Sequence, residues 1–192
     1  PKIFSRINED LKKMKKTISS IGLIALTVLA TSLAWMPTAH YEVSDGYTID
    51  FKSKDPSGSF KTMDGTVEFD EANMDATQFN LKIDVKSIST GNGMMNKKSQ
   101  TEEWFDAAKF PLAKFKSTKV VKKGAELSIV GDLTIKGITK QYTIPATYTV
   151  TGNKISFKGT FNVNRLEFKV GHKSDVVPEL MKVSFQVPVT KK

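Results

Sequence analysis

Apolar and polar residues alternate with a period of two through most of the chain after Tyr47, and this alternation limits the folds open to the chain. The clearest run contains Phe79, Leu81, Ile83 and Val85, each followed or preceded by a polar residue. Successive side chains of a β-strand point to opposite faces, so the run predicts a strand with one dry and one hydrated face. Similar runs continue to the C-terminus and predict an all-β protein.

Turn residues separate the alternating runs and set the number of strands. Clusters with Gly, Pro, Asn or Asp occur at residues 55–58, 122–124, 136–137 and 151–153. The predicted strands cover residues 46–54, 58–70, 77–88, 113–121, 125–136, 139–151, 154–165 and 180–190. Long consecutive strands joined by short turns favour a closed, eight-stranded antiparallel barrel, because closure leaves no exposed edge. A β-sandwich is the main alternative.

One internal segment, residues 91–111, breaks the alternation and is too long for a hairpin turn. Thr101 is followed by two glutamates, which suits the first turn of a helix. We therefore predict a loop with one short helix, whose Trp104, Phe105 and Phe110 cover one end of the barrel.

The N-terminal segment has the parts of a secretory signal peptide: basic residues at 12–16, then an uncharged run at 17–36. The predicted organisation is an upstream extension at 1–13, a signal peptide at 14–34, a flexible mature start at 35–45 and the barrel domain at 46–192. Cleavage is expected after Ala34, with Ala39 as second choice. A retained membrane anchor is the alternative, since the run could just span a bilayer. Cleavage predicts a periplasmic or secreted protein.

Composition excludes several classes of site. The chain has no cysteine and two histidines, so disulfides, thiolate metal sites and histidine-rich metal sites cannot form. The net charge is +9, but lysines and acids are interleaved, and Arg165 is the only arginine beyond the leader. Nucleic-acid binders usually cluster such residues on one face. We expect no nucleic-acid partner, no metal and no cofactor.

Catalytic motifs are also missing from the sequence. It has no Gly-x-Ser-x-Gly elbow, no Gly-x-Gly-x-x-Gly loop and no Walker loop. We predict that the protein is not an enzyme; if it were, Asp132, Arg165 and Glu167 would be the residues to inspect. His172 is interpreted as an ordinary loop residue, with a contact to a polar head group as the alternative.

The inward faces of the predicted strands are rich in phenylalanine, so a ligand held there would be apolar along most of its length. The candidate ligand-binding residues are Phe51, Phe60, Phe69, Phe79, Leu81, Ile83, Trp104, Phe105, Phe115, Phe157, Phe161, Arg165, Phe168 and Phe185. A barrel of eight strands can instead fill its interior with side chains. The alternative is therefore a stress-response or structural barrel with a packed core that acts through its surface.

Residues 84–117 followed by 131–140 resemble the YceI-like family. The shared motifs are a Ser-Ile-x-Thr turn, a Trp-Phe-Asp cap, a Phe-Pro-x-x-x-Phe-x-Ser strand and a Gly-Asp-Leu-Thr-Ile-x-Gly-x-Thr-Lys hairpin. The resemblance implies a lipocalin-like barrel, exported to the periplasm or beyond, that binds polyisoprenoid or isoprenoid-quinone chains without a common enzymatic activity. Many relatives carry a histidine where this chain has Lys98.

Surface contacts are predicted only in outline. Two lysine pairs in predicted loops, Lys97-Lys98 and Lys122-Lys123, are interpreted as solubilising surface charges, with attraction to anionic lipid head groups at a membrane surface as the alternative. The oligomeric state is expected to be a monomer or a homodimer.

Overall fold

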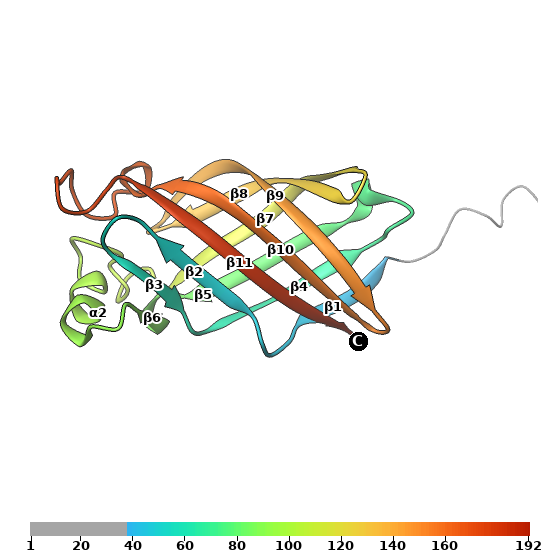
Figure 1. Ribbon diagram of the computed structural model, residues 1–192, viewed down its shortest axis with the longest axis horizontal. Helices are drawn as coiled ribbons and strands as arrows, with labels where there is room; N and C mark the ends of the chain where they lie inside the picture. Colours follow the sequence, from blue (N-terminus) through green and yellow to red (C-terminus); the bar gives the residue numbers. More distant parts are fainter. Residues whose placement is uncertain (1–37) are drawn as a thin grey trace, which may run out of the picture. The chain divides into compact units, whose positions relative to one another are not determined.

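The computed structural model describes residues 38–192, so the predicted extension, signal peptide and first residues of the mature chain lie outside the described part. The described residues form a closed antiparallel β-barrel (Figure 1), which confirms the predicted fold class. The strands are β1 (Ala39–Val43), β2 (Thr48–Lys52), β3 (Ser57–Phe60), β4 (Met63–Phe69), β5 (Gln78–Asp84), β6 (Ile88–Ser89), β7 (Leu112–Lys123), β8 (Glu126–Ile135), β9 (Ile138–Thr151), β10 (Lys154–Asn164) and β11 (Leu180–Lys191).

The wall of the barrel has eight strands, and short breaks divide three of them into two pieces each: β1 and β2, β3 and β4, and β5 and β6. Both β1 and β2 pair with β11, β1 also pairs with β4, and β2 also pairs with β3. The predicted strand 58–70 is broken at Lys61 and Thr62, because their N–H groups donate to Oγ of Ser87 instead of to a neighbouring strand. The pairing of β1 with β4 and with β11 closes the barrel.

The start of the barrel is ordered where we predicted a flexible segment at 35–45. Ala39–Val43 form β1, which has a hydrogen-bonded partner strand on each edge. Tyr41 is buried in the core and its ring lies against Phe69. The prediction was wrong for these residues because a run of five is too short for its alternation to stand out.

The predicted short helix exists but begins earlier than Thr101. Helix α2 (Gly93–Ser99) starts after Asn92, whose Oδ1 accepts the N–H groups of Met94 and Met95. This side chain caps the helix, whereas the residues after Thr101 form successive turns. Three 3-10 helices complete the described part: η1 (Met74–Ala76), η2 (Val85–Ser87) and η3 (Arg165–Phe168). Within residues 38–192, no helix has the length and apolar character needed to cross a bilayer.

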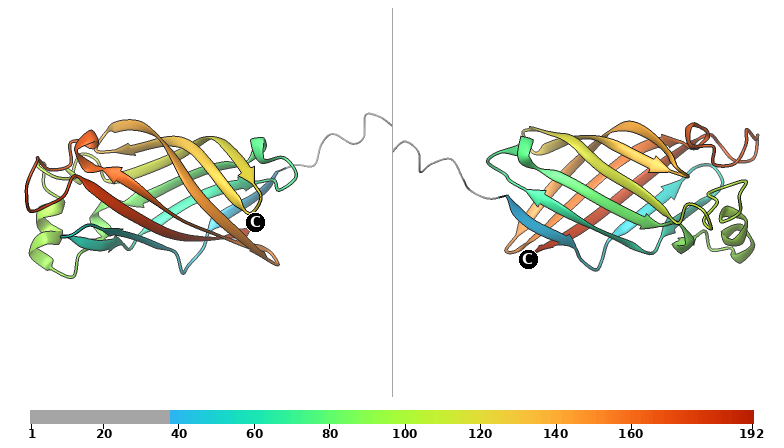
Figure 2. Two further views of the ribbon diagram at one scale, coloured as in Figure 1. Left: turned by 45° about the horizontal axis from the view of Figure 1, so that its top comes forward. Right: turned by 180° about the vertical axis from the view of Figure 1, so that it is seen from behind.

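The two ends of the barrel differ. Helix α2 and the loop between η3 and β11 lie at one end, which we call the open end, and the turn between β9 and β10 lies at the other, the closed end (Figures 1 and 2). Near the closed end Phe157 is fully buried between Phe69 and Phe79, with ring centroids 5.7 and 5.0 Å away. Edge-to-face packing of this kind fills the interior.

The ladder between β9 and β10 stops halfway along the barrel. Its last pair is Ala146 with Gly159, whereas β9 stays paired with β8 as far as Ile138. The stop coincides with Pro145, which has no N–H to donate. Toward the open end, the aromatic ring of Tyr142 lies in the unpaired stretch. Its centroid is 6.2 Å from that of Phe161 and 5.9 Å from that of Phe168. We call this stretch the seam.

Candidate functional site: an apolar cavity inside the barrel

The open half of the barrel contains a cavity made of two adjacent chambers. The larger chamber, about 360 Å³, lies beneath α2 and the loop before β11. The smaller chamber, about 100 Å³, lies deeper among the strands. Six residues line both chambers: Ile49, Ile83, Ala113, Leu133, Phe161 and Val183. The interior is thus hollow toward the open end and packed with side chains at the closed end. The sequence left open a ligand cavity or a packed core, and the barrel has one in each half.

The structure brings thirteen of the fourteen candidate residues to the cavity. The larger chamber is lined by Phe51, Phe60, Trp104, Phe105, Arg165 and Phe168, the smaller by Phe79, Leu81, Phe115, Phe157 and Phe185, and both by Ile83 and Phe161. The nine that lie on strands converge because residues two apart on a strand share a face, and the barrel turns that face inward. Trp104 and Phe105 reach the chamber from the turns after α2, and Arg165 and Phe168 reach it from η3.

Phe69 is the exception and does not line either chamber. Its ring packs against Tyr148 at 5.2 Å and against Phe157 at 5.7 Å between centroids. Alternation correctly predicts that Phe69 points inward, but it carries no information about how far along the barrel the cavity extends. Phe69 forms part of the floor rather than the wall.

Several lining residues were missed because they lie outside the alternating strands. Met95 and Lys98 reach the larger chamber from α2, and Val177 reaches it from the loop before β11. Nothing in their local sequence marks an inward direction. Val183 and Leu133, by contrast, belong to runs whose alternation already predicted an apolar inward face.

Lys98 and Arg165 are the charged residues that line the larger chamber. Arg165 is only 5% exposed, and its guanidinium lies 5.5 Å from the centre of the Trp104 ring. Its N–H groups donate to the main-chain oxygens of Val170, His172, Val177 and Pro178 at 2.7–2.9 Å. Burial lowers the pKa of Arg165, and the nearby charge of Glu179 opposes this effect. Arg165 thus holds the loop before β11 over the cavity.

The other residues considered for chemistry lie elsewhere. Glu167 is exposed and accepts a hydrogen bond from Tyr142, and Nδ1 of exposed His172 lies 2.9 Å from Oε1 of Glu103. Asp132 is on β8 and lines neither chamber. Among the described residues that line the chambers there is no aspartate, glutamate or histidine. What the lining offers a ligand is mainly apolar contact; the buried indole N–H of Trp104 has no hydrogen-bond partner among the described residues.

Ionisation of Tyr142, the residue at the seam, makes the stability of the barrel depend on pH in the alkaline range. Burial, followed by its hydrogen bond to Glu167, raises the pKa of Tyr142 to about 12. An unfolded tyrosine ionises near pH 10, so the stabilisation is complete below about pH 10 and is lost as the pH rises through about 12. We expect the wild-type free energy of unfolding to fall more steeply over this interval than that of Tyr142→Phe. Denaturant titrations at several alkaline pH values measure the two slopes, and equal slopes contradict the assignment.

Together, the closed eight-stranded wall, the capping loops and the apolar interior define a lipocalin-like binding barrel. The YceI-like domain model matches residues 36–190, more than three quarters of the chain, and the chain therefore belongs to the YceI-like family. YceI of Salmonella arizonae is 44% identical over 89 residues, which cover 46% of this chain and 47% of the relative. The aligned part spans about half the length of the curated relatives it matches.

Solved structures show the same fold. BcnA of Burkholderia cenocepacia superposes with a TM-score of 0.72 at 29% identity, covering 75% of this chain and 96% of BcnA. The YceI protein of Campylobacter jejuni gives 0.67 at 22% identity, covering 73% and 88%. A Saccharophagus degradans domain described as polyisoprenoid-binding and implicated in plant cell wall breakdown gives 0.63 at 12% identity, covering 81% and 99%. The last two likenesses carry the fold alone.

Proposed function

We propose that the protein binds one linear, apolar lipid of the isoprenoid type inside the barrel and carries or stores it without changing it chemically. The observation that carries this proposal is the two-chambered cavity, whose lining is almost entirely aliphatic and aromatic. A site of this kind favours an apolar ligand because burying the ligand removes apolar surface from water without leaving a polar group unbonded. The polyisoprenoid-binding domain that shares the fold supports the isoprenoid class.

Extraction of the exported protein with organic solvent tests the ligand directly. We expect mass spectrometry of the extract to detect an isoprenoid lipid at close to one molecule per chain. The same extraction from protein denatured and washed before refolding serves as the blank. Natively exported protein that yields no lipid above this blank contradicts the proposal.

Export is the second part of the proposal. We propose that the leader is removed after Ala34 and that the protein acts in the periplasm or outside the cell. The fold supports this choice of site, because cleavage after Ala39 would remove the first paired residue of β1, which lies opposite Phe69. Intact mass of the protein recovered from the periplasmic fraction gives the new N-terminus. Recovery of the whole chain in the membrane fraction indicates the retained anchor instead.

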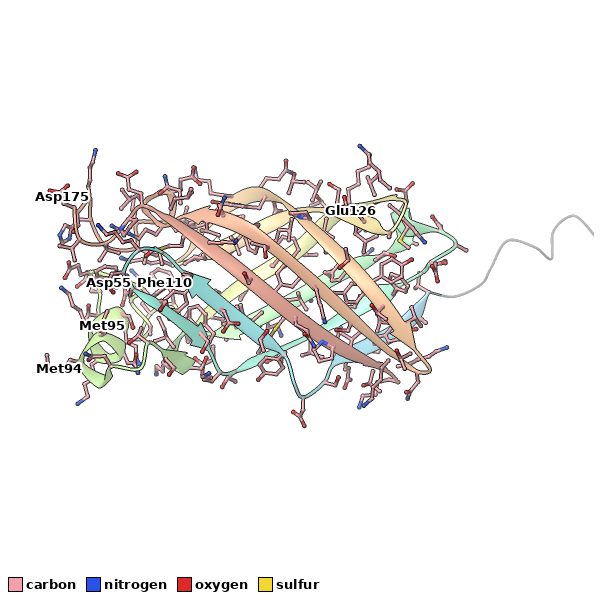
Figure 3. All side chains as sticks on the ribbon, viewed as in Figure 1. Asp55, Met94, Met95, Phe110, Glu126 and Asp175 are labelled. Carbon is pink, nitrogen blue, oxygen red and sulfur yellow. The ribbon has the colours of Figure 1, made fainter. Side chains whose placement is uncertain are left out.

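The open end supports a brief contact with a membrane. The large apolar side chains of residues 38–192 that stand exposed are Met94, Met95, Val150, Val176 and Leu180. All but Val150 belong to α2 or to the segment before or at the start of β11, at the open end; Figure 3 labels Met94 and Met95 there. Met95 also lines the larger chamber, so this surface is continuous with the cavity. We propose that these side chains enter the bilayer interface while the lipid is transferred.

Substitution of the exposed open-end residues tests this contact. In Met94→Asp/Val176→Asp, two side chains that are 80% and 69% exposed become charged, so the fold is unaffected but insertion into the interface is disfavoured. We expect lipid transfer from vesicles to slow roughly tenfold, which corresponds to about 1.4 kcal/mol. Val150→Asp is the matched control at the closed end. Equal transfer rates for the two variants contradict membrane contact at the open end.

A further inference from the structure

The lining of the cavity stops at a definite depth along β10. Val163 lines the larger chamber, Phe161 lines both chambers and Phe157 lines the smaller one. Ile155, the next residue of β10 that points inward, lines neither chamber and is 1% exposed. Along this strand the interior therefore changes from cavity to packed core between Phe157 and Ile155.

Two other long strands show a boundary of the same kind. On β8, Ile129 lines the smaller chamber, whereas Leu127 lines neither chamber and belongs to the buried core. On β11, Val187 lines the smaller chamber, whereas Val189 lines neither chamber and belongs to the same core. Val187 is the β11 residue that pairs with Phe157. The deep end of the cavity therefore rests on packed side chains.

Phe157 lies between the smaller chamber and the packed aromatic rings of the closed end. Its own side chain lines the chamber. The rings of Phe69 and Tyr148, whose centroids lie 5.7 and 6.3 Å from that of Phe157, line neither chamber. A ring with the chamber on one side and solid core on the other determines where the cavity ends.

The volume of the chambers limits how much of a lipid chain they can enclose. The two chambers have volumes of about 360 and 100 Å³. An apolar protein cavity of about 150 Å³ takes up one molecule of benzene. On this scale the chambers together hold about 18 carbon atoms, which is between three and four isoprene units. A longer chain must therefore leave part of its length outside the chambers.

We propose that Phe157 is a specificity-determining residue, whose ring ends the cavity and limits the enclosed part of the ligand to three or four isoprene units. This inference rests on the proposed lipid-binding function and deepens it by naming a chain length. Units beyond the fourth add little to the affinity, because they bury little apolar surface in the barrel. Truncation of Phe157 should open the space of about one benzene ring, and hence of about one more unit.

A series of linear prenols of increasing length tests the limit. The probes are geraniol, farnesol, geranylgeraniol and geranylfarnesol, and each competes with the apolar dye N-phenylnaphthylamine. Only ratios of affinities within one protein are compared, so the affinity of each variant for the dye cancels. In the wild type we expect farnesol to bind at least roughly tenfold more tightly than geraniol, and geranylfarnesol to bind within about threefold of geranylgeraniol.

Phe157→Ala should move the limit to a longer chain. We expect this variant to bind geranylfarnesol at least roughly tenfold more tightly than it binds geranylgeraniol. Ile155→Ala is the matched control, because it truncates a buried side chain of the same strand and leaves the ring of Phe157 in place. Its ratio should stay within about threefold, as in the wild type. If Phe157→Ala fails to fold, Phe157→Leu replaces it, with an expected ratio of at least roughly threefold in favour of geranylfarnesol.

Three results overturn the role of Phe157. The first is a folded Phe157 variant with the wild-type ratio, and the second is an Ile155→Ala ratio as large as that of Phe157→Ala. The third is a wild-type affinity that still rises tenfold from geranylgeraniol to geranylfarnesol, which refutes the length limit but leaves the proposed function intact. A wild-type protein that takes up the dye but binds none of the four prenols refutes the isoprenoid function, and the length limit with it.

Discussion

Phe161→Glu is expected to empty the cavity while the barrel stays folded. Phe161 lines both chambers, so a carboxylate there would contact a ligand that occupies either one. The apolar side chains around Phe161 cannot replace the water that hydrates a carboxylate. Burying that charge beneath an apolar ligand therefore costs several kcal/mol of binding free energy. We expect lipid content to fall at least tenfold, measured by extraction and mass spectrometry of the purified protein.

The neighbouring residue provides the control for Phe161→Glu. Asn162 is exposed on the outer face of the same strand, so Asn162→Glu adds the same charge without entering the cavity. Phe161→Leu keeps the site apolar and should retain its lipid. Circular dichroism establishes that all three variants are folded. A folded Phe161→Glu protein with wild-type lipid content means that the ligand does not pass between the chambers.

Arg165→Ala is expected to lower the free energy of unfolding by about 2–4 kcal/mol and to release the loop before β11. Four main-chain oxygens of residues 170–178 lose their charged donor together. Arg165→Lys should recover only part of the loss, because an ammonium group cannot reproduce the planar arrangement of guanidinium donors. Denaturant unfolding measures the stability, and amide hydrogen exchange over residues 169–179 measures the loop.

Lys173→Ala is the control for Arg165→Ala. Its side chain is 85% exposed on the same loop, so its removal should change the free energy of unfolding by less than about 0.5 kcal/mol. Slow, wild-type exchange of the loop amides in Arg165→Ala would show that other contacts hold the loop. The larger chamber would then keep its cover without the guanidinium.

The strands could be predicted because one physical rule acts along their whole length. A wall with a dry inner face imposes the same alternation on every strand, so the runs around Leu81 and Phe161 identify their own inward faces. The breaks at Lys61 and Thr62 could not be predicted, because they depend on Ser87, which is distant in sequence. Helix α2 lies within the predicted loop 91–111, but it begins at Gly93, after the cap at Asn92, and not at the acidic residues that follow Thr101.

The sequence predicts which side chains of the candidate site point into the barrel, but not how far along the barrel the cavity extends. The alternation shows that Phe69 and Phe79 both point inward, yet Phe69 belongs to the packed floor and Phe79 borders the smaller chamber. Depth depends on how rings from different strands fill a shared volume, which no single strand encodes. For the same reason Val177 and Lys98, which come from a loop and a helix, could not be assigned to the cavity in advance.

At the seam, β9 and β10 are easier to separate than where their backbones are hydrogen-bonded. Where β9 and β10 are paired, parting them means breaking a row of main-chain hydrogen bonds, whereas beyond Ala146 and Gly159 it means displacing the ring of Tyr142. Side-chain contacts of this kind can open locally without global unfolding. A thick ligand can therefore part β9 and β10 at the side of the barrel without breaking their main-chain ladder.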